Sequence, residues 1–203
     1  MGFSFHEPRE GYIMLSKYWV ERGMAVNSLL QMMYNRRSTR IFDTKPLARE
    51  IIESLETAAL LAPAGRNKKT CTFLMVQDKA LLQQLAKAKV HGSGMLASAS
   101  AAMVVLGNEQ ETDVWIEDAS VATTFVLLMA EACHIGACWV QIRHRYQDLE
   151  ETISSEAFVQ NVLQLPSHQR VLSLVALGYK AEEKPARTKE SLDWNRLIDD
   201  QYT

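Results

Sequence analysis

The sequence predicts an α+β fold with helices on both faces of a small sheet. Helical and strand patterns alternate along most of the chain, but the first 60 residues are helical before any strand pattern appears. The residues from 180 onward are polar and have no core period of their own. Their few apolar side chains need a surface to cover them, which a second subunit could provide.

Composition restricts the class of protein. The chain has 203 residues, of which 47% are hydrophobic and 23% charged, as in one globular domain with short arms. A net charge of −2 disfavours a broad electrostatic attraction to nucleic acid. Three cysteines without a CxxC pair, no secretory signal and no apolar stretch long enough for a bilayer favour a cytoplasmic protein without a membrane partner.

Helices and strands are predicted from the spacing of apolar residues and from the residues that begin or end an element. After a loose arm at 1–12, apolar residues at helical spacing predict helices over 13–34 and 47–61. Asp78 and Asp118 are suitable N-caps for two later helices. The remaining helices are expected at 79–89, 118–134 and within 147–164, and the strands at 72–77, 101–107, 137–142 and 171–179.

The stretch "NRRSTRIF", Asn35 to Phe42, places three arginines just before two large apolar side chains. A guanidinium matches phosphate oxygens in a two-point geometry, and a serine hydroxyl can add one hydrogen bond. The cluster therefore predicts a phosphate cradle, and a solvated loop paired with Glu50 or Asp43 is an equal alternative. The basic run "KPARTK" at 184–189 could complete such a cradle, or it could be a solvated tail.

Other motifs are less specific. The turn "APAGRN" at 62–67 contains a glycine for unusual backbone angles and an asparagine that can read a heterocycle edge, although an ordinary turn explains it as well. "HGSGM" at 91–95 lacks a dinucleotide fingerprint and is expected to be a flexible loop that could cover a ligand. Cys133, His134 and Cys138 lack a fourth metal ligand, so no metal site is expected. No nucleophile motif supports a serine hydrolase.

Taken in order, four segments between about 30 and 190 resemble the nitroreductase family of flavoproteins. They are "RRSTRIF", "AALLAPAGRNKKTCTFLMV", "HIGACWV" and "LQLPSHQRVLSLVALGYKAEE". The resemblance implies a three-layer α+β fold with a small mixed or antiparallel sheet, in a homodimer with swapped terminal arms and FMN at the subunit interface. It implies three parts, which are an N-terminal arm and helix (1–34), the FMN-binding domain (35–180) and a C-terminal extension on the partner (181–203).

The resemblance also implies a reaction and a set of cofactor-binding residues. NAD(P)H would reduce the flavin and leave before a nitroaromatic, a quinone or an activated alkene enters. Arg36, Ser38 and Arg40 would hold the FMN phosphate, with Arg37 contributing mostly through its backbone. The other expected contacts are Lys184 and Arg187 at the phosphate, Pro63, Ala64, Gly65 and Asn67 from the partner subunit, and Cys138, Trp139, Val140 and Gln141 along the isoalloxazine ring. No side chain need act as a nucleophile, because the flavin carries the hydride.

One departure from the family pattern concerns the substrate pocket. Lys69, Thr70 and Cys71 stand where the family usually has Gln-Pro-Trp. The loss of the tryptophan opens volume, and Lys68 and Lys69 bring positive charge, so Lys69 and Cys71 are candidate pocket residues. The change favours acidic or smaller oxidants, or weak activity, and it leaves open a flavin-binding protein without turnover. A reductive dehalogenase or a flavin-consuming enzyme is disfavoured, because the 91–100 segment is short for an added lid.

Overall fold

The computed structural model describes residues 26–198, which belong to two compact units. The larger unit runs from Arg36 to Ala186, and the smaller combines residues 26–35 with residues 187–198. The expected three parts, with boundaries at 34 and 180, remain a prediction.

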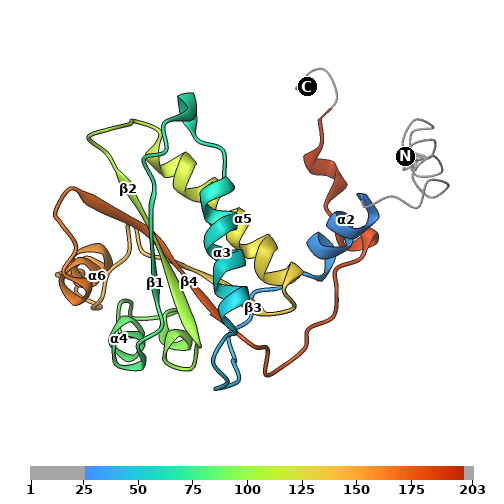
Figure 1. Ribbon diagram of the computed structural model, residues 1–203, viewed down its shortest axis with the longest axis horizontal. Helices are drawn as coiled ribbons and strands as arrows, with labels where there is room; N and C mark the ends of the chain where they lie inside the picture. Colours follow the sequence, from blue (N-terminus) through green and yellow to red (C-terminus); the bar gives the residue numbers. More distant parts are fainter. Residues whose placement is uncertain (1–25, 199–203) are drawn as a thin grey trace, which may run out of the picture. The chain divides into compact units, whose positions relative to one another are not determined.

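A four-stranded antiparallel sheet forms the centre of the larger unit (Figure 1). The strand order is β1-β2-β4-β3, so β1 and β3 are the edges. The central strands are almost wholly buried, as their uninterrupted apolar sequences predict. The strands are β1 (Thr72–Val76), β2 (Ala101–Asn108), β3 (Gly136–Gln141) and β4 (Gln169–Gly178), close to the predicted ranges.

Helices cover both faces of this sheet and complete three layers, as predicted (Figure 1). Successive residues of β2 point to opposite faces, so Val105 packs on one side and Val104 on the other. The Val105 side is covered by α3 (Arg49–Leu61) and α5 (Trp115–Ala132), and the Val104 side by α4 (Lys79–Leu85) and α6 (Ser155–Leu163).

Helix α4 begins as predicted but ends early. The Asp78 carboxylate accepts a hydrogen bond from Leu81 N at 2.8 Å and caps the first turn. The expected extent to residue 89 was wrong, because the fully buried Ser93 closes the chain back on the helix end. Its hydroxyl donates to Ala86 O at 2.8 Å and accepts from Lys89 N at 3.1 Å. The expected flexible loop at 91–95 is therefore anchored, and it leads into the short 3₁₀ helix η2 (Gly94–Ala97).

Helix α5 begins at Trp115, not at Asp118. The expected N-cap role of Asp118 was therefore wrong, because this residue lies inside the first turn. Its carboxylate accepts a hydrogen bond from Gly65 N, far away in the sequence. The first turn of α5 thus supports the turn that follows α3.

The smaller unit contains α2 (Val26–Asn35) and two short 3₁₀ helices, η3 (Lys189–Ser191) and η4 (Trp194–Arg196). Arg187 N donates to Tyr34 O at 2.9 Å and joins its two segments. Of the helix predicted over 13–34, residues 13–25 lie outside the described residues, as does the arm at 1–12.

Candidate functional site

The arginine-rich segment lies along the outer edge of β3. Ser38 forms a parallel bridge with Ala137, and Thr39 N donates to Ala137 O at 3.0 Å. Backbone pairing to an edge strand therefore fixes the segment independently of its arginine side chains.

Gly136 permits this close approach. A Cβ atom at this position would lie 2.6 Å from Thr39 Cγ2, and Thr39 is itself buried. Any side chain at position 136 would push the arginine-rich segment away from β3. The glycine of "HIGACWV" thus has a steric role beside the predicted cradle.

Four of the predicted phosphate-binding residues influence the pKa of the Cys138 thiol. Burial raises the pKa of this thiol, while Arg40, Ser38, Lys184 and Arg36 act together to lower it. The Lys184 ammonium donates to Ser38 O at 3.1 Å and lies 3.1 Å from Glu182 Oε1. The structure therefore places one hydroxyl and three cations near the edge strand β3. We call Arg36, Ser38, Arg40 and Lys184 the cradle.

This donor set suits a phosphate group. Guanidinium forks, an ammonium and a hydroxyl all donate hydrogen bonds, and phosphate oxygens only accept them. The Asp43 carboxylate accepts a hydrogen bond from Lys45 N at 3.3 Å. The chemistry of the cradle residues thus fits the phosphate of a mononucleotide.

Two other predicted phosphate ligands lie differently. The Arg37 guanidinium donates to Pro185 O at 2.6 Å, so its side chain is directed toward the C-terminal segment. A contribution of Arg37 through its backbone remains a prediction. Arg187 belongs to the smaller unit, and its role at the phosphate remains a prediction.

The predicted flavin-facing strand residues divide between the two faces of β3. Cys138 and Val140 are buried in the core on the α4 and α6 side. Trp139 and Gln141 are half-buried on the other face, where Trp139 Nε1 donates to Gln141 Oε1 at 2.9 Å. Gln141 Nε2 in turn donates to Arg143 O at 3.0 Å. The polar side chains of this strand are thus held in one defined arrangement.

The predicted turn at 62–67 follows α3 and contains the 3₁₀ helix η1 (Gly65–Asn67). Arg66 and Asn67 both adopt the left-handed conformation, with φ of 54° and 56°. Pro63 and Asn67 are exposed, whereas Ala64 is half-buried. Two successive non-glycine residues in this conformation carry backbone strain, which the surroundings must hold.

The first turn of α5 holds this strained turn in place. Gly65 N donates to Asp118 Oδ1 at 2.8 Å, and a Cβ atom on Gly65 would lie 2.8 Å from Val114 Cγ2. Asp118 is buried, and its second oxygen, Oδ2, has no hydrogen-bond partner among the described residues. Sequence reasoning missed this role, although a polar residue one helical turn from Trp115 on a buried face was a usable signal.

The segment that departs from the family pattern borders an open hollow. Lys68 and Lys69 are exposed and line this hollow, of about 490 Å³, together with Thr70 and Glu111. Cys71 is half-buried, and burial, with the Asp118 charge, raises the pKa of its thiol to about 11. At neutral pH Cys71 is therefore a neutral thiol.

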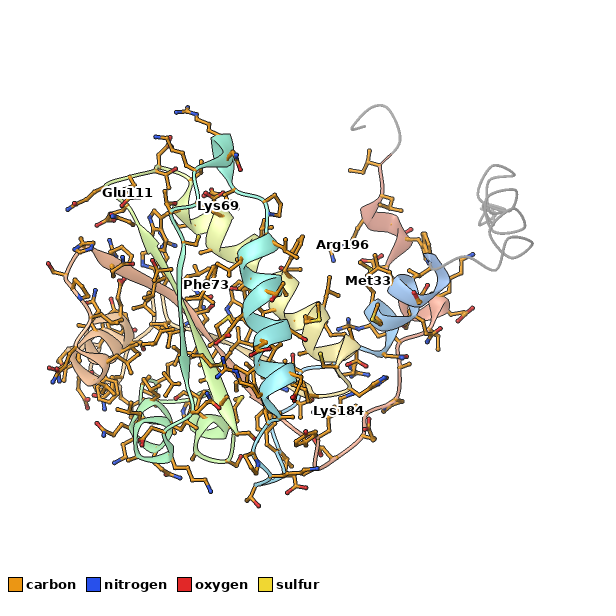
Figure 2. The ribbon with its side chains drawn as sticks, viewed as in Figure 1. Met33, Lys69, Phe73, Glu111, Lys184 and Arg196 are labelled. Atoms are coloured by element: carbon orange, nitrogen blue, oxygen red, sulfur yellow. The ribbon has the colours of Figure 1, made fainter. Side chains whose placement is uncertain are left out.

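The cradle and the turn lie apart within one chain. Figure 2 shows Lys69, from the segment after the turn, and Lys184, from the cradle, near opposite ends of α3. That helix has 13 residues, a length of about 20 Å. One chain therefore carries two separate groups of predicted cofactor-binding residues.

Two kinds of feature are absent from residues 26–198. In this part of the chain, no three His, Cys, Asp or Glu side chains gather in a way that could hold a metal ion. No helix there is both long and apolar enough to span a membrane.

Comparisons with known proteins agree with one another. The model of the family described as "Nitroreductase family" matches residues 33–93 and 88–179. A protein of Archaeoglobus fulgidus named "Putative NADH dehydrogenase/NAD(P)H nitroreductase" is 35% identical over 159 residues, which cover 76% of this chain and 87% of that protein.

Solved structures show the same relationship. An FMN-dependent nitroreductase from Clostridium difficile R20291 superposes with a TM-score of 0.82 and 31% identity, covering 85% of this chain and 99% of that one. A structure from Desulfovibrio desulfuricans described as a "putative nitroreductase in complex with fmn" has the same fold, with a TM-score of 0.69 and 22% identity over 88% of this chain and 100% of that one.

Proposed function

The chain belongs to the nitroreductase family of oxidoreductases, and from that premise we propose that it is an FMN-dependent enzyme. It would oxidise NAD(P)H and reduce nitroaromatics, quinones or related electron acceptors. The observation that supports the proposal is the pairing of the cradle segment with the edge strand β3, at Ser38, whose carbonyl oxygen also accepts a hydrogen bond from Lys184.

In this proposal the cradle binds the FMN phosphate. Arg36 and Arg40 offer two-point hydrogen bonds, and the Ser38 hydroxyl adds a third donor. Lys184 is already tied to Ser38 O, so little side-chain entropy is lost when it faces an anion. Arg37 contributes through its backbone, and Arg187 closes the phosphate site from the C-terminal side.

The chemistry that FMN supplies when bound is two-electron transfer between a nicotinamide and an acceptor. The chain would position the ring and leave one face open to both substrates in turn, which would give ping-pong kinetics. The backbone from Cys138 to Gln141 would lie along the ring, and the hydrogen bond between Trp139 and Gln141 keeps those side chains in place. No side chain is required to act as a nucleophile.

We further propose that the enzyme is a homodimer with terminal arms that cross to the partner. The separation of the turn from the cradle supports this, because a second copy would bring Pro63, Ala64, Gly65 and Asn67 to a flavin held by the cradle. The neighbouring helices α3 and α5 also expose large apolar side chains that an interface would cover. Their exposed fractions are 63% for Leu60, 70% for Leu61, 37% for Val121 and 37% for Phe125.

A cytoplasmic location completes the proposal. Its support is that Cys71, Cys133 and Cys138 are all free thiols in the structure, as a reducing compartment would keep them.

The visible spectrum tests this function directly. The purified protein is mixed with FMN, desalted, and measured before and after anaerobic addition of NADPH or NADH. We expect a retained yellow chromophore that bleaches with one of the nucleotides. Retained colour without bleaching would favour the flavin-binding protein without turnover, the alternative raised by Lys69, Thr70 and Cys71. A colourless protein would contradict the phosphate assignment.

A further inference from the structure

The buried carboxylate of Asp118 has an unusual environment. Only 7% of the residue is exposed, and it lies on the face of α5 that also carries the buried Ala119 and Ala122. One oxygen accepts from Gly65 N at 2.8 Å, while the other is buried without a hydrogen-bond partner among the described residues. A buried carboxylate with a single hydrogen bond is costly, and an apolar residue would serve simple packing better.

The segment that this carboxylate holds is the strained one. Gly65 immediately precedes Arg66 and Asn67, which both have positive φ. Val114, at the start of α5, lies so close that no side chain fits on Gly65. One steric contact and one charge-assisted hydrogen bond thus seat the turn on α5, and the hydrogen bond is the one that directs the Gly65 peptide.

We propose that Asp118 is a positioning residue for the cofactor. Its hydrogen bond to Gly65 N keeps the turn in the conformation that presents Asn67 outward, to the flavin bound by the partner subunit. The inference rests on the proposed function, because only a flavin at the dimer interface gives this turn its role. We call the hydrogen bond from Gly65 N to Asp118 the lock. It is a property of the single chain and can be measured without flavin.

Limited proteolysis tests the lock on the flavin-free protein. Arg66, Lys68 and Lys69 are exposed trypsin sites within or just after the turn. We expect Asp118→Ala to raise the rate of cleavage there by about tenfold or more, because a hydrogen bond to a charged group is lost. Cleavage after Lys87, an exposed residue just after α4, should stay at the wild-type rate. In Asp118→Asn the amide oxygen can still accept from Gly65 N, so the turn should remain largely protected.

Thr123→Val is the matched control. Thr123 is fully buried on the same helix, donates to Ala119 O at 2.8 Å, and lies 3.3 Å from Ser173 Oγ. Its loss should destabilise α5 without altering cleavage at the turn. Wild-type rates at the turn in Asp118→Ala, or an equal increase in Thr123→Val, would overturn the proposal.

Hydrogen exchange covers the case in which Asp118→Ala fails to fold. In the wild-type protein the Gly65 amide should exchange much more slowly than the exposed amides that neighbour it, and rapid exchange would overturn the lock.

Flavin binding then tests the functional half of the inference. We expect Asp118→Ala to weaken FMN binding about tenfold, Asp118→Asn to restore most of that loss, and Thr123→Val to change it little. Unchanged FMN affinity in Asp118→Ala would overturn the positioning role. A wild-type protein that holds no FMN would instead contradict the proposed function. The proteolysis result would still test the hydrogen bond between Gly65 N and Asp118, because it is measured without flavin.

Discussion

The cradle and the turn at 62–67 both lie outside the regular elements, but they are held in different ways. The cradle segment is held by backbone pairing with β3. The turn has two residues with positive φ and depends on the buried Asp118 carboxylate. Side-chain changes in the cradle should therefore affect binding, whereas changes around the turn should affect local shape.

The largest effect is expected from a cradle arginine. Arg36→Ala should weaken FMN binding by about 1.5–3 kcal/mol, since a hydrogen bond between charged groups is lost. The melting temperature of the flavin-free protein should stay close to that of the wild type, because backbone pairing holds the segment. Fluorescence titration of FMN and thermal unfolding by circular dichroism measure the two quantities.

A charge-matched control is available on α3. Arg49 pairs with Glu53 at 2.8 Å on the exposed surface, and Arg49→Ala should leave FMN binding unchanged. Equal FMN affinity in Arg36→Ala and the wild type would remove the phosphate assignment.

The second prediction tests whether the cradle depends on close packing at Gly136. Gly136→Ala places a methyl group 2.6 Å from Thr39 Cγ2, so the arginine-rich segment has to shift. We expect the free energy of unfolding to fall by about 1–3 kcal/mol, as for other overpacked cores, and FMN binding to weaken as well. Urea unfolding and FMN titration measure both effects.

Gly107→Ala is the steric control for this variant. Gly107 lies on the central strand β2 and not at the cradle. A Cβ atom there would lie 2.6 Å from Cε3 of Trp115, the first residue of α5. Its unfolding free energy should fall by a similar amount with a smaller loss of FMN affinity. If both variants lose FMN affinity equally, the cradle geometry is not what Gly136 protects.

The residues of the cradle are easier to group from the sequence than the contact that supports the turn, for a physical reason. The arginines and Ser38 lie within five residues, so their shared chemistry is visible in one stretch. The hydrogen bond between Gly65 and Asp118 joins residues 53 positions apart, and no local period encodes it. The local rule for N-caps even assigned Asp118 a different role.

Helix ends show the same limit. The apolar spacing of α4 continues to Ala88, which is fully buried, so periodicity alone extends the helix too far. The Ser93 hydroxyl then takes the hydrogen bonds of Ala86 O and Lys89 N, and this competition ends the helix. The strands and layers were predictable because continuous apolar runs determine them without such distant contacts.

A smaller effect is expected from the ammonium of the cradle. The Lys184 side chain is 30% exposed and already 3.1 Å from Glu182 Oε1, so solvent and that carboxylate screen its charge. Lys184→Met should weaken FMN binding only about two- to fivefold, or about 0.5–1 kcal/mol. The loss should shrink in high salt, and Lys87→Met, on the exposed surface, should show no loss. A loss as large as that of Arg36→Ala would mean that Lys184 is a principal phosphate ligand.

The smallest effect on FMN binding is expected from pH, through the thiol of Cys71, which follows the turn at 62–67. Because the pKa of Cys71 is raised from its ordinary value of 9.0 to about 11, the thiol stays protonated in the folded protein through neutral pH. FMN affinity should therefore show no step from this thiol between pH 7 and pH 9.

Above pH 9 the unfolded chain loses this proton first, so the contribution of Cys71 to stability falls as the pH rises toward 11. Alkylation by iodoacetamide, followed by peptide mapping, should be about 100-fold slower at Cys71 than at the same residue in the unfolded chain at pH 8. Rapid alkylation of folded Cys71 at that pH would show that neither burial nor Asp118 suppresses the thiolate.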